Sequence, residues 1–454
     1  MGAAASAPEA PCDADPMTLL RERPAFARLF AGGTISLVGD WFGFVAIQVL
    51  ALSSGGGPVD LAIVLAAHTL PIAFGSVFSG AIVDRFDRRK VLVAADAIAT
   101  ALTVGMTIAA SARQLHALEG LLVLRGIVTS IVPPAEAAAV RRFVGERDLV
   151  RANTLLASSW SLTYVVGMAL GGVAASLGAV VALAIDALSF AVATALHASL
   201  PPIPIESTEP DVSLARAIRR APRDTALALA IASRRPRLFA ALLAKAPLAL
   251  ASGAAWVAMS AVAESHESSV VVPLVLGALQ SVRGAGTVLG PATLLRGDGP
   301  HHAAVFVSRA GTYASVAAIG LVDARLGLAL VALAWGIGAG TNWVASHAEL
   351  LRRAPDAALG RLAAFDELLV AVATVLGTFV GALVVVTHGE RPAALAAATI
   401  GLGAWAVVRW ATGWSVRHAK ERERVPNRLA PAEGSPYLRP LPSEDSCPAK
   451  SLPV

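Results

Sequence analysis

Cysteine, charged residues and catalytic motifs are all scarce in this sequence. The only two cysteines, Cys12 and Cys447, lie near the ends of the chain, so its body offers no disulfide framework and no cysteine-based metal site. Charged residues make up 15% of the chain, whereas an average soluble protein has roughly 25%. HExxH, GxSxG and paired aspartate-rich motifs are absent, as is the glycine-rich ATP-binding loop GxxxxGKS/T. We therefore expect no enzyme, no metal, no cofactor and no ATP-driven transport.

Long apolar runs fill most of the chain. Hydrophobic residues make up 56% of it, and its mean hydropathy is +0.65. A transmembrane helix needs about 20 predominantly apolar residues. Runs of that length predict twelve transmembrane helices, near 26–52, 59–83, 90–111, 115–138, 155–177, 179–200, 238–262, 270–295, 303–322, 326–348, 361–387 and 391–413. The sequence therefore predicts an all-α, multi-pass membrane protein.

The breaks between the apolar runs divide the chain into parts. Most are short and rich in glycine, proline or charge, but 201–237 is long and separates the spans six and six. We predict a cytoplasmic tail at 1–25, a six-helix bundle at 26–200, a cytoplasmic loop at 201–237 and a second six-helix bundle at 238–413. Residues 414–454 are rich in proline and charge without apolar periodicity, which predicts a disordered cytoplasmic tail.

Basic residues alternate between densely and sparsely charged loops. A pI near 9.7 is compatible with nucleic-acid binding, but the bases form short clusters between apolar runs, which indicates membrane topology instead. The loops of one side each carry several bases, whereas the other side has only Arg113, Arg325 and Arg391. The positive-inside rule then places both termini in the cytoplasm. Because the chain is rich in alanine and arginine and poor in lysine, we expect a bacterial inner-membrane protein.

Glycines recur at corresponding positions of the two halves. The pairs, each separated by 210 residues, are Gly80 and Gly290, Gly167 and Gly377, and Gly171 and Gly381. The shared offset indicates parallel structural repeats. The glycines of the fifth and eleventh spans also have the small-xxx-small spacing that lets two helices pack closely.

Residues 80–90, GAIVDRFDRRK, form the densest charge cluster and follow an almost uncharged run. Basic residues alone would be enough to hold this end of the helix in the cytoplasm. Topology does not explain Asp84, because this acid weakens the positive charge and sits at a helix end where desolvation of a carboxylate is costly. The order Gly80, Asp84, Arg85, Arg88, Arg89 resembles the loop signature between the second and third helices of the major facilitator superfamily. Two positions depart from that signature: Asp87 stands where its second glycine would be, and Leu294 stands where the acid of a second-half copy would be.

This resemblance implies a twelve-helix major facilitator fold and a role for the charged loop. In that family, the aspartate corresponding to Asp84 contacts the start of the eleventh helix, where the helix dipole is positive. We expect Arg88 to pair with Glu136 near the end of the fourth span. The loop would act as a conformational latch that is closed in only one of two states. The latch residues would be Gly80, Asp84, Arg85, Arg88, Arg89 and Glu136.

Two longer stretches resemble one branch of the family more closely. Residues 23–50, RPAFARLFAGGTISLVGDWFGFVAIQVL, have a basic, phenylalanine-containing lead and a Gly-Asp in the middle of the first span. Residues 124–156, LRGIVTSIVPPAEAAAVRRFVGERDLVRANTLL, lie in and after the fourth span. Both resemble bacterial exporters of the enterobactin and macrolide type, which implies efflux.

Ionisable residues inside predicted spans are candidates for function, because charge at bilayer depth is costly and faces a cavity or a partner. Asp40, Arg125 and Arg283 lie near the middle of the first, fourth and eighth spans, and we assign them to proton coupling or to the substrate cavity. A buried ion pair that only fixes helix packing is the alternative. Six charges nearer span ends are expected to snorkel or to cap helices; they are Asp96, Asp186, Lys245, Asp366, Glu367 and Arg409.

These observations favour a secondary active transporter that exports small amphipathic molecules by alternating access, with proton antiport as the energy source. A proton-coupled importer of a small organic solute and a non-transporting membrane scaffold or sensor remain alternatives. The expected partners are the lipid bilayer, protons and a small-molecule substrate, with no nucleic acid, and the expected oligomeric state is a monomer. Midplane ionisable residues that face a cavity distinguish a transporter from a scaffold.

Overall fold

The computed structural model describes residues 17–53, 57–204, 214–268, 271–295 and 302–424. Most of the predicted N-terminal tail, and residues 425–454 of the predicted C-terminal tail, lie outside these described residues. The helices of the first half are α1 (Thr18–Glu22), α2 (Pro24–Ser53), α3 (Pro58–Val83), α4 (Arg88–Ser111), α5 (Leu115–Thr129), α6 (Val132–Ser176) and α7 (Ala179–Ala198). The helices that follow are α8 (Leu214–Ser233), α9 (Pro236–Leu243), α10 (Ala246–His266), α11 (Val272–Leu294), α12 (His302–Ala318), the short 3-10 helix η1 (Ile319–Leu321), α13 (Arg325–Arg353), α14 (Asp356–His388) and α15 (Glu390–Arg424).

Eleven helical segments among the described residues are long and apolar enough to cross a membrane. One of them, Leu115–Ser176, is 62 residues long and contains both the fourth and the fifth predicted spans. The two spans meet at Gly145 inside α6, where φ is 73° and ψ is 174°, a conformation that glycine adopts far more readily than other residues. The predicted all-α membrane protein with twelve membrane-spanning helices is therefore confirmed.

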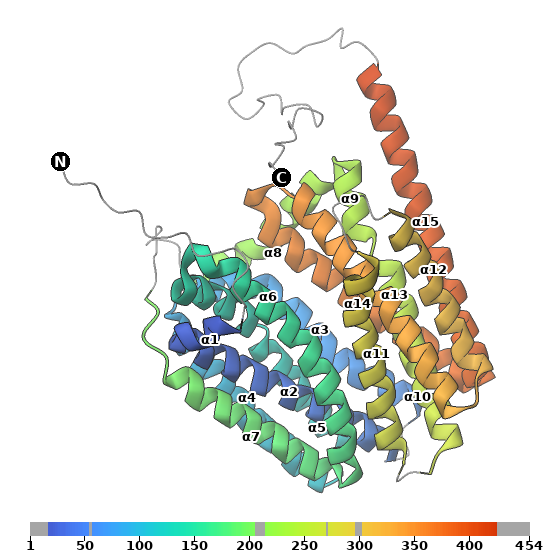
Figure 1. The fold of residues 1–454 in the computed structure, drawn as a ribbon, viewed down its shortest axis with the longest axis horizontal. Helices are drawn as coiled ribbons and strands as arrows, with labels where there is room; N and C mark the ends of the chain where they lie inside the picture. The colour runs from blue at the N-terminus through green and yellow to red at the C-terminus, as the bar shows by residue number, and fades with distance from the viewer. Residues whose placement is uncertain (1–16, 54–56, 205–213, 269–270, 296–301, 425–454) are drawn as a thin grey trace, which may run out of the picture.

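The helices form two bundles with the same internal packing (Figure 1). In the first half, α2 packs against α6 and α7, α5 packs against α3 and α4, and α4 packs against α7. In the second half, α10 packs against α14 and α15, α13 packs against α11 and α12, and α12 packs against α15. The two halves meet through α6 with α11 and through α3 with α14, which are again equivalent pairs. The predicted arrangement of two repeated six-helix bundles is confirmed.

Glycines allow the equivalent helices to approach closely in each half. A Cβ atom added at Gly171 on α6 would lie 3.1 Å from the Phe42 Cα on α2, and one at Gly381 on α14 would lie 2.7 Å from the Ala254 Cα on α10. Gly167 and Gly377 contact the same partner helices one turn earlier. The third pair differs, because Gly290 packs against the backbone of Ile337 whereas Gly80 faces open space.

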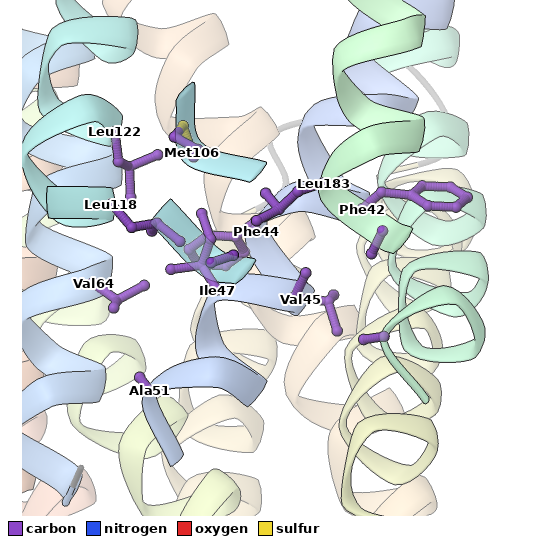
Figure 2. Close-up of a cluster of buried hydrophobic side chains, with 14 of the residues drawn as sticks. Phe42, Phe44, Val45, Ile47, Ala51, Val64, Met106, Leu118, Leu122 and Leu183 are labelled. Atoms are coloured by element: carbon purple, nitrogen blue, oxygen red, sulfur yellow. The ribbon is translucent and has the colours of Figure 1, made fainter. Parts of the chain in front are cut away.

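A cluster of apolar side chains fills the first bundle beneath α2 (Figure 2). Figure 2 shows Phe44 and Ile47 of α2 close to Leu118 of α5, with Val64 of α3 to one side. Phe44 and Ile47 are almost completely buried, as is Leu118. This packing holds α2 and α5 at a fixed separation and so positions the polar side chains that lie further along both helices.

Contacts between the two halves are concentrated towards one face of the membrane. We call the face with residues 84–87 and α8 the terminal side, and the opposite face the far side. Between mid-membrane and the far side, Trp256 donates to Gln48 at 3.1 Å, and Gly172 and Gly277 let α6 and α11 touch. At the terminal side, Gly80 on α3 and Gly360 on α14 both face open space, although α8 contacts both of these helices. The contacts between the halves named here therefore lie in mid-membrane and on the far side.

Two segments contain more helix than the sequence predicted. The predicted central loop includes α8, which buries Ala228 and Ala232 against α9, α13 and α14 and leaves Arg219 and Arg220 exposed. The predicted disordered tail begins as helix, because α15 continues to Arg424. Alanine, glutamate, lysine and arginine all favour helix, and a search for apolar runs does not register that propensity in polar segments.

Candidate functional site

Three helices of the first half bring one arginine and two carboxylates together. Arg125 on α5 donates from Nη2 to Asp40 Oδ1 on α2, and from Nη1 to Asp186 Oδ2 on α7, each at 2.6 Å. We call Asp40, Arg125 and Asp186 the central ion cluster. A guanidinium group presents several donors in one plane, so it can bind two separate carboxylates at once. The structure therefore places the predicted cavity residues Asp40 and Arg125 in direct contact.

Two glycines beside Asp40 make this cluster possible. A Cβ atom added at Gly43 would lie 2.2 Å from Asp186 Oδ2, and one added at Gly39 would lie 1.8 Å from Ser189 Oγ. Larger residues at either position would push α7 away from α2 and would move Asp186 out of reach of Arg125. The local sequence GDWFG, residues 39–43, thus supplies both an acid and the space for a second acid.

One part of the central ion cluster is completely buried, and the other part is partly exposed. Only 2% of the Arg125 side chain and 0% of the Asp186 side chain are exposed, compared with 20% for Asp40 and 11% for His68. His68 on α3 lies with Nε2 3.3 Å from Asp40 Oδ2, the carboxylate oxygen that Arg125 does not bind. Asp40 and His68 therefore keep some exposed surface, whereas Asp186 has none.

The charges of the central ion cluster do not balance. One guanidinium faces two carboxylates, and Asp186 Oδ1 has no hydrogen-bond partner among the described residues. With both carboxylates ionised, Asp40, Arg125 and Asp186 carry one net negative charge, which is costly at membrane depth.

Arg283, the third predicted cavity residue, lies at the junction of the halves and apart from the central ion cluster. Its Nε donates to Gln280 Oε1 at 2.8 Å, and its Nη2 donates to the Tyr164 hydroxyl on α6. The guanidinium also lies over the rings of Tyr164, Trp256 and Trp335. Arg283 on α11 thus contacts residues of both bundles, and aromatic rings surround its guanidinium group.

The predicted latch residues do not act together in this structure. Asp87 caps α4 by accepting from the Lys90 amide at 3.2 Å, and it also accepts from the Ile203 amide at 3.1 Å. Arg88 donates to the Pro204 carbonyl at 3.3 Å, and Arg89 donates to the Ala198 carbonyl at 2.5 Å. The loop is therefore fastened to the segment after α7, and the departure at Asp87 supplies a helix cap where the family signature has a glycine.

Asp84 and Glu136 lie apart from these contacts. Asp84 is exposed, and its side chain makes no hydrogen bond or ion pair within the described part of the chain. Glu136 does not pair with Arg88; it faces Gly33 on α2, where an added Cβ would lie 2.3 Å from Glu136 Oε1. Arg85 is half-buried at the end of α3. The structure leaves Asp84 on the terminal side, free of the second half.

Several charges near span ends are buried and paired, so the expectation that they snorkel or cap helices was wrong. Asp96 on α4 lies 2.5 Å from His197 Nδ1 on α7, with 1% and 0% of the two side chains exposed. Lys245 donates to Asp366 on α14, and 3% and 1% of these side chains are exposed. Asp186 belongs to the central ion cluster, as described above. Among the six, Glu367 and Arg409 are exposed.

The balance of intramembrane charges in the sequence indicates that these residues have partners. A charge within an apolar run needs a partner of opposite charge or a strong hydrogen bond, and the first half contains more intramembrane acids than bases. Asp186 and His68 therefore needed partners on other helices. Which partners they have depends on the packing of α2 against α7 and on the position of α3, and neither follows from one sequence.

An apolar pocket of about 650 Å³ lies between α3 and α5 at the edge of the second half. It is lined only by glycine and apolar residues, including Pro71, Phe74 and Phe78 of α3, Ile127 of α5 and Phe379 of α14. Because residues of both halves form it, its shape changes if the halves move relative to each other.

Twelve membrane-spanning helices in two equivalent bundles are the architecture of a major facilitator superfamily transporter. Residues 15–433 match the family model described as "Transmembrane secretion effector", and the chain belongs to this family. Solved transporters share the fold at low sequence identity. A bacterial homologue of the human lysosomal transporter Spinster aligns with a TM-score of 0.66 at 13% identity, over 93% of this chain and 100% of that one. The nucleoside transporter NupG aligns with a TM-score of 0.65 at 14% identity, over 87% and 99% of the two chains.

Curated relatives match part of the chain. The multidrug efflux pump Tap of Mycobacterium tuberculosis is 30% identical over 185 residues, which are 39% of this chain and 44% of Tap. Macrolide efflux protein A of Streptococcus pyogenes is 29% identical over 172 residues, 37% of this chain and 42% of that protein. An uncharacterized MFS-type transporter of Bacillus subtilis, YfiS, is 28% identical over 155 residues, 34% and 36% of the two chains. The matches thus span less than half the length of each of these relatives.

Proposed function

We propose that this protein is a secondary active exporter of small amphipathic molecules, driven by proton antiport. The observation that carries the proposal is the central ion cluster, in which one arginine holds two carboxylates and only one of these carboxylates is accessible. The names of Tap and macrolide efflux protein A support export. The apolar pocket shared by both halves supports an amphipathic substrate.

The central ion cluster couples proton uptake to a change in helix contacts. While Asp40 is ionised, its bond to Arg125 holds α2 against α5. A proton on Asp40 removes the charge that attracts Arg125, so this bond weakens and Arg125 remains bound to Asp186 alone. A proton released on the opposite face restores the bond. The cluster thereby gives the two conformations different proton affinities, which antiport requires.

Alternating access follows from movement of one bundle against the other. The contact of Trp256 with Gln48 and the open space at Gly80 and Gly360 favour a conformation in which the far side is closed and the terminal side is open. With both termini in the cytoplasm, as the positive-inside rule favours, this is the conformation that is open to the cytoplasm. The opposite conformation brings α3 and the start of α14 together, where Gly80 and Gly360 now face open space. Asp84 then reaches the positive end of α14 and acts as the latch.

The proton-coupling proposal is tested with Asp40→Asn in everted inner-membrane vesicles. In vesicles with an acid interior, 2-naphthylacetate should release protons through the wild-type protein, beyond the release in vesicles that lack the protein, followed by acridine orange fluorescence. Asp40→Asn should abolish this release, because a neutral amide cannot exchange a proton, while the amount of inserted protein stays unchanged. Asp323→Asn is the matched control, since Asp323 forms a solvent-exposed pair with Arg391. Unchanged proton release by Asp40→Asn would rule out the coupling role.

The latch is tested by comparing two aspartates of the same loop. Asp84→Asn should slow transport severalfold without changing thermal stability, because Asp84 makes no contact in the conformation described here. Asp87→Ala should instead lower stability by about 1 kcal/mol, because Asp87 caps α4. Initial transport rates and apparent melting temperatures of both variants separate the two roles. If Asp84→Asn transports at the wild-type rate, Asp84 does not act as a latch.

A further inference from the structure

Arg283 is a cation inside the protein without an acidic partner. Its hydrogen bonds go to neutral groups, the Gln280 amide oxygen and the Tyr164 hydroxyl, and it forms no ion pair with any described carboxylate. Arg125 and Lys245, which are also buried in the bundles, each bind at least one carboxylate. An uncompensated charge at this depth is costly, which points to a ligand or a partner as its complement.

Aromatic rings hold the Arg283 guanidinium in place. Its Cζ lies 5.2 Å from the ring centroid of Tyr164, 5.0 Å from that of Trp256 and 4.9 Å from that of Trp335. Cation–π contacts of this kind offset part of the charge, but they occupy the faces of the guanidinium and leave its in-plane donors available. Arg283 is thus held between rings from both halves, and its Nη1 makes no hydrogen bond within the described part of the chain.

Two buried donors around Tyr164 lack acceptors. Gln280 is 3% exposed, and its Nε2 has no hydrogen-bond partner in the part of the chain that the structure describes. The orientation of this amide is fixed, because Oε1 accepts from both Arg283 Nε and the Tyr164 hydroxyl. Trp41 Nε1 is also buried without a partner, and the Trp41 ring lies edge-on to Tyr164 at 4.7 Å. A buried donor without an acceptor is rare in folded proteins.

We propose that Arg283 and Gln280 form a binding site for an anionic group, with Tyr164 positioning both side chains. A carboxylate fits this set, because it accepts from several donors and supplies the charge that Arg283 lacks. Trp256, which is half-buried, and Trp160, which is exposed and stacks on Tyr164, offer apolar surfaces for the body of the same molecule. The transported substrate is therefore an amphipathic acid, a carboxylate attached to an aromatic or aliphatic body. This inference rests on the proposed transport function and specifies its substrate class.

Matched ligands test the sign of the charge that the site accepts. The full-length protein in lipid nanodiscs is equilibrated by dialysis with 2-naphthylacetate, 2-naphthylacetamide or 2-(2-naphthyl)ethylammonium, and binding to empty nanodiscs is subtracted. These probes share one apolar body and differ in charge. The wild-type protein should bind the acid about tenfold more tightly than the amide or the amine, as charge-assisted hydrogen bonds at a partly buried site predict.

Variants connect that preference to Arg283. Arg283→Gln should reduce the preference for the acid to less than about twofold, whereas Arg283→Lys should keep part of it, because charge remains without the fork of donors. Gln280→Leu should weaken binding of the acid alone, and it provides the test if Arg283→Gln does not fold. Arg309→Gln is the control, since Arg309 is another partly buried arginine of the second half that donates to a side-chain amide, that of Asn342.

The outcomes are distinct from those of the proton-coupling experiment. Equal or tighter binding of the amide or the amine would overturn the proposal, as would no binding of the acid at concentrations up to about 1 mM. An equal loss in Arg309→Gln would also overturn it, because the effect would then come from overall charge. Dialysis measures binding without a proton gradient, so failure of proton coupling in Asp40→Asn leaves this result unchanged, and loss of the acid preference leaves proton antiport standing.

Discussion

Replacing Arg125 with leucine should remove most of the folded protein from the membrane. The change leaves Asp186 without a partner and Asp40 with His68 alone, and 0% of the Asp186 side chain is exposed. Removing one partner of a buried ion pair destabilises proteins by about 3–5 kcal/mol, and here two acids lose the same partner. Arg125→Lys should be less severe but still defective, because the donors of an ammonium share one nitrogen, whereas Arg125 reaches each of the two acids with a separate nitrogen.

Neutralising the acids should restore folding without restoring transport. The triple variant Arg125→Leu, Asp40→Asn, Asp186→Asn removes all three charges, so it should insert and remain monodisperse where Arg125→Leu alone does not. It should not exchange protons, because no titrating carboxylate remains in the cluster. Fluorescence-detected size-exclusion chromatography across a temperature ramp measures the folded fraction. Arg141→Leu is the control at an exposed arginine, and wild-type stability of Arg125→Leu would contradict the buried-cluster argument.

The number and limits of the spanning helices could be predicted because the bilayer imposes a simple requirement on sequence. A membrane helix satisfies its own backbone hydrogen bonds and needs an apolar surface along its whole length, and both properties are local. The predicted first span, 26–52, agrees with Pro24–Leu52, and the predicted sixth span, 179–200, agrees with Ala179–Ala198. The polar helices α8 and the end of α15 escaped this reasoning because they do not need that surface.

The candidate site could be predicted only where a residue is anomalous by itself. Asp40 and Arg125 stand out at the middle of apolar spans, and the structure joins them. Asp186 and Asp96 lie nearer to span ends, so the sequence alone did not distinguish a side chain that reaches water from one that reaches another helix. The deciding quantity is the distance between helices, which glycines such as Gly39 and Gly43 reduce. That distance is a property of the assembled bundle.

Lys245 and Asp366 form a buried ion pair in the second half. Lys245 lies at the break between α9 and α10, donates to Asp366 on α14 and rests over the Trp343 ring, with Nζ 4.3 Å from its centroid. Each single variant, Lys245→Met or Asp366→Leu, leaves one buried charge unpaired and should lower stability by about 3–5 kcal/mol. The double variant should recover most of that loss, because buried ion pairs replaced by apolar residues of similar size are often close to neutral.

A double-mutant cycle measured by apparent melting temperature, together with transport rates, distinguishes a role of this pair in stability from a role in transport. The two single effects should be strongly non-additive, since the residues share one contact. We expect the folded double variant to keep transporting, because 3% and 1% of these side chains are exposed and neither can exchange protons with an accessible cavity. Asp40 differs, with 20% of its side chain exposed beside His68. Loss of proton antiport in a well-folded double variant would mean that the second half also takes part in proton coupling. Retained antiport leaves Asp40 as the acid that exchanges protons. The pair of Lys245 and Asp366 then serves to hold α14 against the start of α10.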